Sequence, residues 1–339
     1  MAQQTMTPLT RRALVRGAAG LAALSAAGAR AQGAAQKPPA GQPLDGGPLH
    51  LVVPYPAGGS TDRAARLLAD AIGPALGVPV LVENRAGAGG RLAAQQVHRE
   101  PAGRNVLLLA NPAPMLVAPL VQKEDGYNPQ TDYRPVSEIT RYAFGIAVGP
   151  AVPVQAFGPL RGWMQANPEK VSVGVPATGS LPHFFALMLA GQLKLDLPVV
   201  GYKGSAPLLN DLMGGHVPVA VDTLDALEPL HRAGKLRILA TSDERRSASL
   251  PQVPTFKESG LTLSASGWNA LFAPASLPAP RLQRIAAAVE RAMADPAVRK
   301  RFADADLVPV GSGPAQTARM LDAYRAQWTP VIRDSGFKP

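Results

Sequence analysis

The sequence predicts an α/β protein with two similar lobes, because strands and helices alternate along most of the chain and the alternation restarts once. Between residues 49 and 110, three short apolar runs typical of strands alternate with two amphipathic helical stretches. A second series of the same kind runs from residue 144 to residue 242. Such an alternation predicts parallel strands joined by right-handed crossovers. With 339 residues, 46% of them hydrophobic, the chain is long enough for two such units.

The first series is expected to form strands at 49–55, 78–84 and 105–110 and helices at 62–73 and 89–100. In the first of these helices, Ala65, Leu68 and Ile72 lie on one side, which predicts a buried face. Ser60 or Thr61 is expected to be its N-cap residue, because both side chains can accept a hydrogen bond from a backbone N–H.

The second series is expected to form strands at 144–150, 171–176, 198–202, 217–222 and 236–242, with helices at 158–168, 180–193, 205–215 and 225–235. After it, only 268–274 and 307–311 have strand character, and helices are expected at 280–294, 297–304 and 313–336. These last elements are expected to complete one of the two lobes rather than to form a third domain.

Residues 1–31 resemble an export signal. The Arg11-Arg12 pair precedes an Ala- and Leu-rich stretch, and Ala29-Arg30-Ala31 has the small-x-small pattern of a signal peptidase site. The arginine pair is compatible with the twin-arginine route and with the general secretory route. A transmembrane helix is the alternative, which Arg16 disfavours. Residues 32–48, rich in Gly, Pro, Ala and Gln, predict a flexible leader.

The composition excludes several kinds of site. The chain has no cysteine, which removes disulfides, thiolate catalysis and the common structural zinc sites. Its five histidines show no metal-binding spacing, so neither a metal nor a cofactor is expected. The net charge is +10, but aromatic residues make up only 5% and the basic residues are scattered, so no nucleic-acid partner is expected.

The loop between the first predicted strand and helix contains Gly58, Gly59, Ser60, Thr61 and Asp62. Ligands of parallel α/β sheets bind at such loops, where glycine allows close approach and a helix N-terminus attracts anions. An ordinary turn is the alternative interpretation. The loop is not a P-loop, because the lysine is missing, and the nearby ENRAGAGGRL segment lacks the third glycine of a dinucleotide-binding motif.

A similar loop occurs in the second series, where Thr178, Gly179 and Ser180 follow a strand and precede a helix. Two small polar helix starts on two similar lobes could hold one anion from both sides. An enzyme is the alternative, with Ser60 or Ser180 as a nucleophile. However, there is no GxSxG motif, and Ser180 and His183 are expected to share a local surface rather than form a nucleophile–base pair.

Six segments in order resemble the periplasmic solute-binding receptors of tripartite tricarboxylate transporters, the Bug receptors. They are VPYPAGGSTDRAAR, VENRAGAGG, GSLPHF, YKGSAPLLNDLMGGHV, RAGKLRILATSDERRSASLPQVPTFKESG and WNALFAPASLPAP. The resemblance implies a type II periplasmic binding protein fold, with a ligand cleft between two α/β lobes. It places lobe 1 at 49–142 and 269–339 and lobe 2 at 143–268.

The resemblance also implies the ligand-binding residues. They are Tyr55, Pro56, Ala57, Gly58, Gly59, Ser60, Thr61, Asp62 and Asn84 in lobe 1, and Ala177, Thr178, Gly179, Ser180, His183, Tyr202, Lys203, Gly204 and Asp222 in lobe 2. Three positions depart from the family pattern: Gly201 replaces a proline, Leu187 replaces a glutamate, and 102–105 reads AGRN instead of DGYT.

The sequence therefore predicts a monomeric periplasmic receptor, not an enzyme. It would capture a small carboxylate-bearing ligand and deliver it to the membrane permease subunits of a tripartite tricarboxylate-type transporter. The alternatives are a carboxylate-sensing receptor for a signalling partner and an exported α/β hydrolase-like enzyme.

Overall fold

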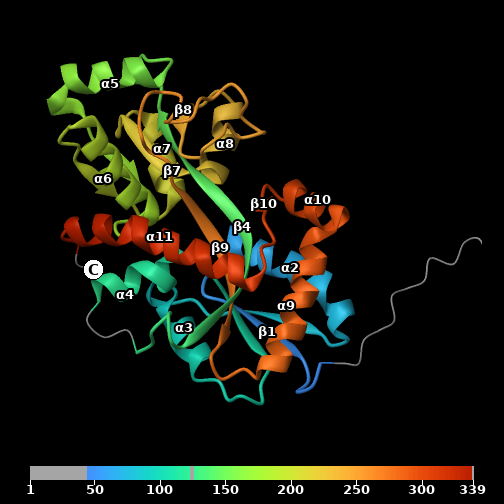
Figure 1. Ribbon diagram of the computed structural model, residues 1–339. Helices are drawn as coiled ribbons and strands as arrows, with labels where there is room; N and C mark the ends of the chain where they lie inside the picture. Colours follow the sequence, from blue (N-terminus) through green and yellow to red (C-terminus); the bar gives the residue numbers. More distant parts are fainter. Residues whose placement is uncertain (1–43, 123–125, 338–339) are drawn as a thin grey trace, which may run out of the picture. The chain divides into compact units, whose positions relative to one another are not determined.

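The computed structural model describes residues 44–122 and 126–337, whose strands form one mixed sheet (Figure 1). The strand order is β2-β1-β3-β9-β4-β7-β5-β6, and β8 and β10 also pair with β4. The predicted signal peptide lies outside the described residues. Of the predicted leader, residues 44–48 are described, and Leu44 is buried with its N–H donating to the carbonyl of Leu76.

The first lobe is built on β1 (Leu49–Val53), β2 (Val80–Asn84) and β3 (Val106–Ala110), which are parallel as predicted. α2 (Ser60–Leu76) connects β1 to β2, and η1 (Ala88–Gly90) with α3 (Arg91–His98) connects β2 to β3. Alternate residues of β1 enter two different cores. Leu51 belongs to the core under α2, α9 (Ala279–Ala294) and α10 (Pro296–Asp304), whereas Val52 packs on the α3 side.

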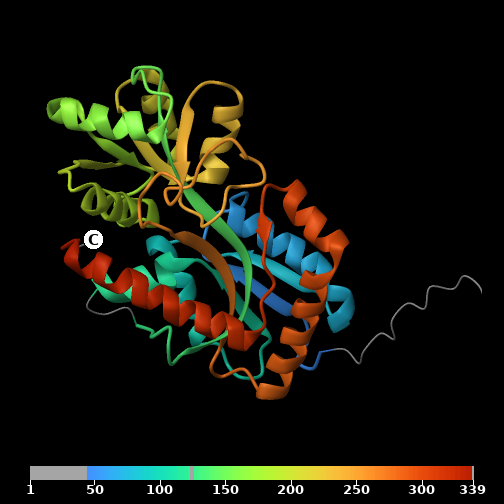
Figure 2. The same ribbon diagram turned by 45° about the horizontal axis from the view of Figure 1, so that its top comes forward.

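The second lobe repeats this arrangement with β5 (Val173–Val175), β6 (Val199–Gly201) and β7 (Val219–Thr223), again parallel. Its helices are α5 (Phe157–Ala166), η3 (Pro168–Lys170), α6 (Leu181–Leu193), α7 (Ser205–Gly214) and α8 (Leu224–Arg232). β8 (Arg237–Thr241) follows and pairs antiparallel with β4. Figure 2 shows these helices around the strands of the second lobe.

β4 (Tyr133–Val148) runs through both lobes and is far longer than the predicted strand at 144–150. Up to Ala143 it pairs with β9 (Ser266–Pro274), and from Phe144 onward it pairs with β7. Register shifts between Pro135 and Ser137 and between Glu138 and Thr140 interrupt its side-chain alternation. These irregularities explain why the sequence pattern does not mark its first half as a strand.

The last helix, α11 (Pro314–Asp334), follows β10 (Val308–Pro309) and contacts β4, α6 and the short helix α4 (Ala118–Val121), which continues η2 (Ala113–Val117). Its first turn is fixed to the first half of β4, because the N–H of Glu138 donates to Oγ1 of Thr317 at 3.1 Å. Further along, Trp328 packs edge-on against Phe144.

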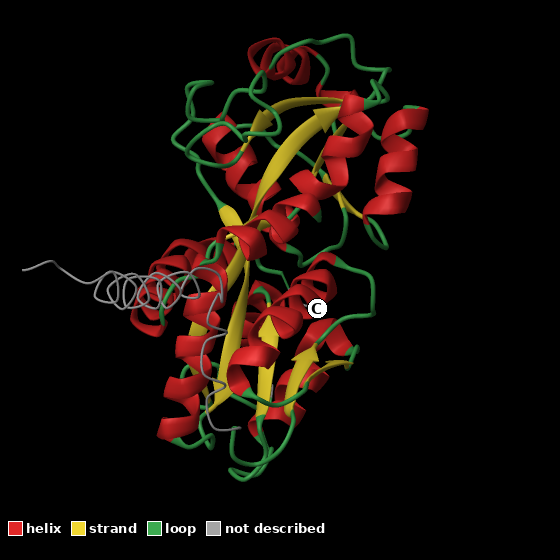
Figure 3. Ribbon diagram, turned by 90° about the vertical axis from the view of Figure 1, so that its right-hand side faces the viewer, coloured by secondary structure: helices red, strands yellow, loops and turns green. Residues whose placement is uncertain are grey.

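Figure 3 shows helices on both sides of the strands in each lobe. Within 44–122 and 126–337, no helix is long and apolar enough to cross a membrane.

Candidate functional site

The first predicted loop, Tyr55–Asp62, leads from the carboxyl end of β1 into α2. The expected N-cap residue was wrong: the cap is Gly59, in an extended conformation, and Ser60 is already the first residue of the helix. The helix therefore begins one or two residues earlier than predicted, and no side chain of the described residues accepts a hydrogen bond at the cap. Pro56, Ala57, Gly58 and Gly59 are exposed.

This helix start leaves backbone donors free. The N–H groups of Ser60 and Thr61 have no acceptor among the described residues, as expected for the first turn of a helix. Gly58 has a φ of 92°, which favours glycine, and Gly59 leaves the space above the helix start open. A carboxylate at such a position gains about 0.3–1 kcal/mol from the helix terminus, and up to ~2 kcal/mol where it is partly buried.

Asp62 organises the loop from inside the protein. Its side chain is buried, and its carboxylate accepts hydrogen bonds from the Gly58 N–H at 2.9 Å, from Arg66 through two nitrogens at 3.0 Å, and from Asn84 at 2.9 Å. Burial by itself would raise the pKa of Asp62, but these donors outweigh it and hold the pKa below its usual range. Asp62 therefore shapes the loop as an anion and is fully engaged with the protein.

Asn84 connects this loop to the end of β2. Its amide nitrogen donates both to Asp62 and to the carbonyl of Tyr55, and its amide oxygen accepts from Arg66 at 3.2 Å. Arg66 was missed by sequence reasoning, although its position four residues after Asp62 on a helix was the available signal.

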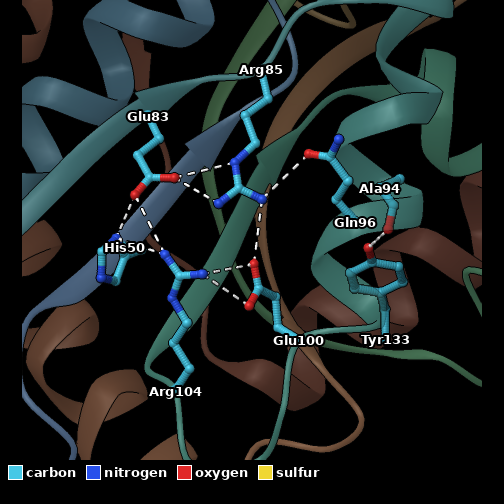
Figure 4. A network of polar contacts seen from close by, with 8 residues as sticks. All are labelled: His50, Glu83, Arg85, Ala94, Gln96, Glu100, Arg104 and Tyr133. Atoms are coloured by element: carbon cyan, nitrogen blue, oxygen red, sulfur yellow. Dashed lines mark hydrogen bonds and ion pairs between the residues drawn. The ribbon is translucent and has the colours of Figure 1, made fainter.

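The residues on either side of Asn84 point to the opposite face of the strand, into a polar network (Figure 4). Glu83 accepts from Arg85 and from His50, and Arg85 also reaches Glu100 at 3.4 Å. Arg104 completes the network with hydrogen bonds to Glu100 at 3.0 and 3.1 Å. The network lies away from the loop and fixes the strand end from which Asn84 reaches it.

Two further side chains of the loop are held by residues distant in sequence. The Tyr55 hydroxyl donates to Asn111 at 2.5 Å, and burial raises the pKa of Tyr55, so this hydroxyl stays protonated. The Thr61 hydroxyl donates to Asn269 on β9 at 2.7 Å, and Asn269 in turn donates to Thr140 on β4. No sequence pattern pointed to these partners, because only the paired strands bring them to the helix start.

The second predicted loop, Ala177–Ser180, leads from β5 into α6 and is closed by its own hydrogen bonds. Here the N-cap is Ser180, whose hydroxyl oxygen accepts from the His183 N–H at 3.4 Å. The same hydroxyl donates to the carbonyl of Ala177 at 2.7 Å. Gly179 has a φ of 78°, while Thr178 is exposed at the tip of the loop.

His183 supports this loop from beneath. Its Nδ1 atom accepts a hydrogen bond from the Gly179 N–H at 3.0 Å, which assigns the ring proton to Nε2. Burial lowers the pKa of His183 and so favours this neutral form. Ser180 and His183 share a local surface, as predicted, and Nδ1 of His183 is occupied by the backbone rather than by the Ser180 hydroxyl.

The third loop, residues 202–204, is attached to the second by backbone hydrogen bonds. The Tyr202 N–H donates to Val175 and the Gly204 N–H donates to Pro176 at 2.7 Å. The Tyr202 hydroxyl donates to Asp211 on α7 at 2.9 Å, and burial together with this carboxylate raises the pKa of Tyr202 to about 12. Tyr202 thus stabilises the lobe, whereas the neighbouring Lys203 is exposed.

Asp222, at the end of β7, is 1% exposed, and its Oδ2 atom has no hydrogen-bond partner among the described residues. Its Oδ1 atom accepts from the N–H of Thr223 at the start of α8. Burial raises the pKa of Asp222 to about 6, with the nearby Asp225 adding to the effect. The Asp222 carboxyl group therefore takes up its proton at a pH only slightly below neutral.

These loops coincide neither with a hollow nor with a metal cluster that the described residues form. Two hollows of about 260 and 360 Å³ lie between η2, residues 127–135 and α11, and neither is lined by a predicted site residue. Across the described ranges, no group of three or more His, Cys, Asp or Glu side chains could hold a metal ion.

Comparisons with known proteins show the family and the fold of the chain. The model of the family described as "Tripartite tricarboxylate transporter family receptor" matches residues 64–337. Among solved structures, Rpa4515 of R. palustris with adipate is 30% identical, with a TM-score of 0.76 over 86% of this chain and 98% of that one. MatC of Rhodopseudomonas palustris with bound malate is 28% identical, with a TM-score of 0.71 over 84% and 98%.

The periplasmic binding protein BugD is also similar, at 29% identity and a TM-score of 0.72 over 86% of this chain and 98% of that one. The fold predicted from the sequence, an α/β periplasmic binding protein fold, is therefore confirmed.

Proposed function

Because the chain belongs to the tripartite tricarboxylate transporter receptor family, we propose that it captures a small carboxylate-bearing ligand between the Tyr55–Asp62 and Ala177–Ser180 loops. The expectation of a binding receptor rather than an enzyme is confirmed by the family. Relatives hold adipate and malate, both of which are dicarboxylates. We propose the same class of ligand for the present chain: a small organic anion with at least one carboxylate.

The observation that carries the proposal is the pair of helix starts at the carboxyl ends of β1 and β5. Both follow a parallel strand, which is where ligands of open α/β sheets bind. At the first, Ser60 and Thr61 present unpaired N–H groups over which Gly59 leaves space. The basic residues near this loop, Arg63 and Arg66, donate to Gly58 and Asp62, so the backbone is the principal donor to the ligand.

The test is binding of a carboxylate panel that includes malate and adipate, measured by calorimetry and thermal shift. A binder should raise the melting temperature with concentration as RT ln(1 + [L]/Kd). Nucleotides and esters serve as comparison ligands. Absence of binding by any mono- or dicarboxylate at millimolar concentration would contradict the proposed ligand class.

Gly59→Trp tests the location of the site. Gly59 has a φ of −71°, and the nearest atom to a β-carbon there lies 4.0 Å away, so the fold accepts a side chain. The indole would cover the free N–H groups, and binding should be lost without loss of stability. Gly162→Trp is the matched control, because Gly162 lies exposed on α5 with no atom within 4 Å of a β-carbon.

We place the hinge between the lobes at the middle of β4 and the start of β9. β4 changes partner there, from Ser266 of β9 opposite Ala143 to Thr223 of β7 opposite Phe144. Ligand binding would favour a closed arrangement of the lobes over an open one. A ligand-induced decrease in the radius of gyration, measured by small-angle X-ray scattering, is the expected result.

We also propose that the chain is exported with residues 1–31 as its signal peptide, acts as a monomer and delivers its ligand to membrane permease subunits. The similarity to a periplasmic binding protein supports export. Mass spectrometry of the protein from the periplasmic fraction should give a mature chain that begins after Ala31. Light scattering should give the monomer mass, and loss of uptake on deletion of the permease genes would support the transport role.

A further inference from the structure

Phe337, which follows α11, lies directly against the second ligand loop. A β-carbon on Gly179 would lie 2.6 Å from the Cζ atom of the Phe337 ring, so this ring occupies the space beside Gly179. Because Gly179 also has a φ of 78°, the loop requires glycine here for two reasons. Phe337 follows α11 and is more than 150 residues away from the loop in sequence.

The same ring packs against the start of α6. Its centroid lies 5.8 Å from that of His183 and 5.9 Å from that of Phe184, at interplanar angles of 76° and 78°. Edge-to-face contacts of this kind between aromatic rings are favourable. Phe337 therefore touches both ends of the hydrogen bond between the Gly179 N–H and His183.

Phe337 is held in turn by α11, whose other end is fixed in the first lobe. Its own N–H donates to the Ser335 hydroxyl at 3.1 Å. At the beginning of the helix, Ser312 and Thr317 accept from the N–H of Glu138 on the half of β4 that pairs with β9. A single helix, α11, thus connects the first lobe to the second ligand loop.

From these contacts we propose that Phe337 is a positioning residue for the ligand site. It holds the Ala177–Ser180 loop in the conformation that binds the carboxylate, and through α11 it makes this conformation depend on the first lobe. The proposal rests on the proposed function of that loop. It assigns a role in binding to a residue that is not itself placed beside the ligand.

The first test uses the ligand-free protein and compares Phe337→Ala with the wild type by NMR. Removal of the ring should speed hydrogen exchange of the Gly179 amide about tenfold or more, because the loop opens more often. It should also expose His183 and move its pKa back toward the ordinary histidine value. Phe337→Leu keeps an apolar side chain of similar reach. It should therefore change the Gly179 exchange rate and the His183 pKa less than Phe337→Ala does.

Leu321→Ala is the control for a purely structural effect. Leu321 lies partly buried on the same helix and lines one of the hollows away from the loop. It should lower the melting temperature without changing exchange at Gly179 or the titration of His183. Unchanged exchange at Gly179 in Phe337→Ala would overturn the proposal.

The second test measures affinity with malate and adipate as probes. If either binds the wild type, Phe337→Ala should weaken it about tenfold, mostly through faster release. Unchanged affinity together with faster Gly179 exchange would overturn the role in binding. If neither probe binds the wild type, the carboxylate of the panel that does bind replaces them. If no carboxylate of the panel binds, the proposed ligand class is in error, while the exchange experiment still decides whether Phe337 positions the loop.

Discussion

The Oγ1 atom of Thr178 occupies the space that a side chain on Gly201 would need. A β-carbon built on Gly201 would lie 1.9 Å from this oxygen and 2.8 Å from the Thr178 nitrogen. The Ala177–Ser180 loop therefore lies against the end of β6, and it can lie there only because residue 201 lacks a side chain. This relationship gives physical meaning to a position at which the family pattern led us to expect proline.

Gly201→Ala should displace Thr178 and with it the tip of the loop. We expect ligand affinity to fall about tenfold and the free energy of unfolding to fall by about 1–3 kcal/mol, as for overpacking. Calorimetric titration and urea unfolding measure the two effects. In a double-mutant cycle, Thr178→Ala should recover part of the loss of stability; strictly additive effects would contradict the close contact.

Asp62→Asn should loosen the first loop, because Arg66 would lose its ionic partner and Gly58 a charged acceptor. We expect a loss of about 1–2 kcal/mol of unfolding free energy at pH 7. The pKa of Asp62 is lowered on folding, so its contribution is present above its unfolded value and is lost as the pH falls through the folded value.

The difference between Asp62→Asn and the wild type should therefore shrink below about pH 4 in urea unfolding. The control is Asp70→Asn on the same helix, since Asp70 is exposed and its ion pair with Arg301 is exposed as well. Equal effects of the two substitutions would show that Asp62 has no special role.

Asp222→Asn should stabilise the protein at neutral pH. Folding raises the pKa of Asp222 from 3.8 to about 6, so the native state binds more protons than the unfolded state between these values. Wild-type stability should fall as the pH rises across this window and stay reduced above it.

The amide variant carries no such charge and should be more stable at pH 7.5 by on the order of 2 kcal/mol. Thermal and urea unfolding at pH 5 and pH 7.5 compare the two proteins. Asp196→Asn is the control, because Asp196 is an exposed carboxylate that does not contribute to the pKa of Asp222. A wild-type profile that is flat from pH 4 to pH 6 would refute the prediction.

Acid should weaken the second loop through His183. Folding lowers its pKa below the ordinary value, so its contribution to stability is present above about pH 6.5 and is lost as the pH falls through the folded value. Protonation of Nδ1 removes the acceptor of the Gly179 N–H. NMR titration of the His183 ring and of the Gly179 amide should show a common midpoint, whereas His216→Gln, an exposed change, should leave that midpoint where it is.

Much of the candidate site could be predicted from local sequence. The strand–turn–helix pattern placed both loops correctly, since glycine, small hydroxyl residues and the apolar periodicity of the following helix act over a few residues. The N-cap of α2 was misplaced by one residue, because Gly59 adopts the extended cap conformation that Ser60 could also have taken. Arg66 was within reach of the same local rules.

The first half of the central strand, β4, could not be predicted from local sequence. The first half of β4 contains Glu138 and Thr140, both buried, which no isolated strand would bury. Arg141 on the same strand binds the Glu138 carboxylate. Distant parts of the chain satisfy the other polar groups: the start of α11 accepts the Glu138 N–H, and Asn269 donates to Thr140. Since these partners come together only on folding, the pattern of residues 133–143 is that of a loop.

The sequence by itself determined the alternation of strands and helices, the two glycine-containing helix starts and the family to which they belong. Only the tertiary structure decided how those starts are held: Thr61 by Asn269, Thr178 by the bare backbone of Gly201, and Gly179 by Phe337 at the end of the chain. The physical reason is the separation along the sequence over which each interaction acts. Turn and cap preferences act between neighbouring residues, whereas steric exclusion and buried hydrogen bonds act between whichever residues the fold brings into contact.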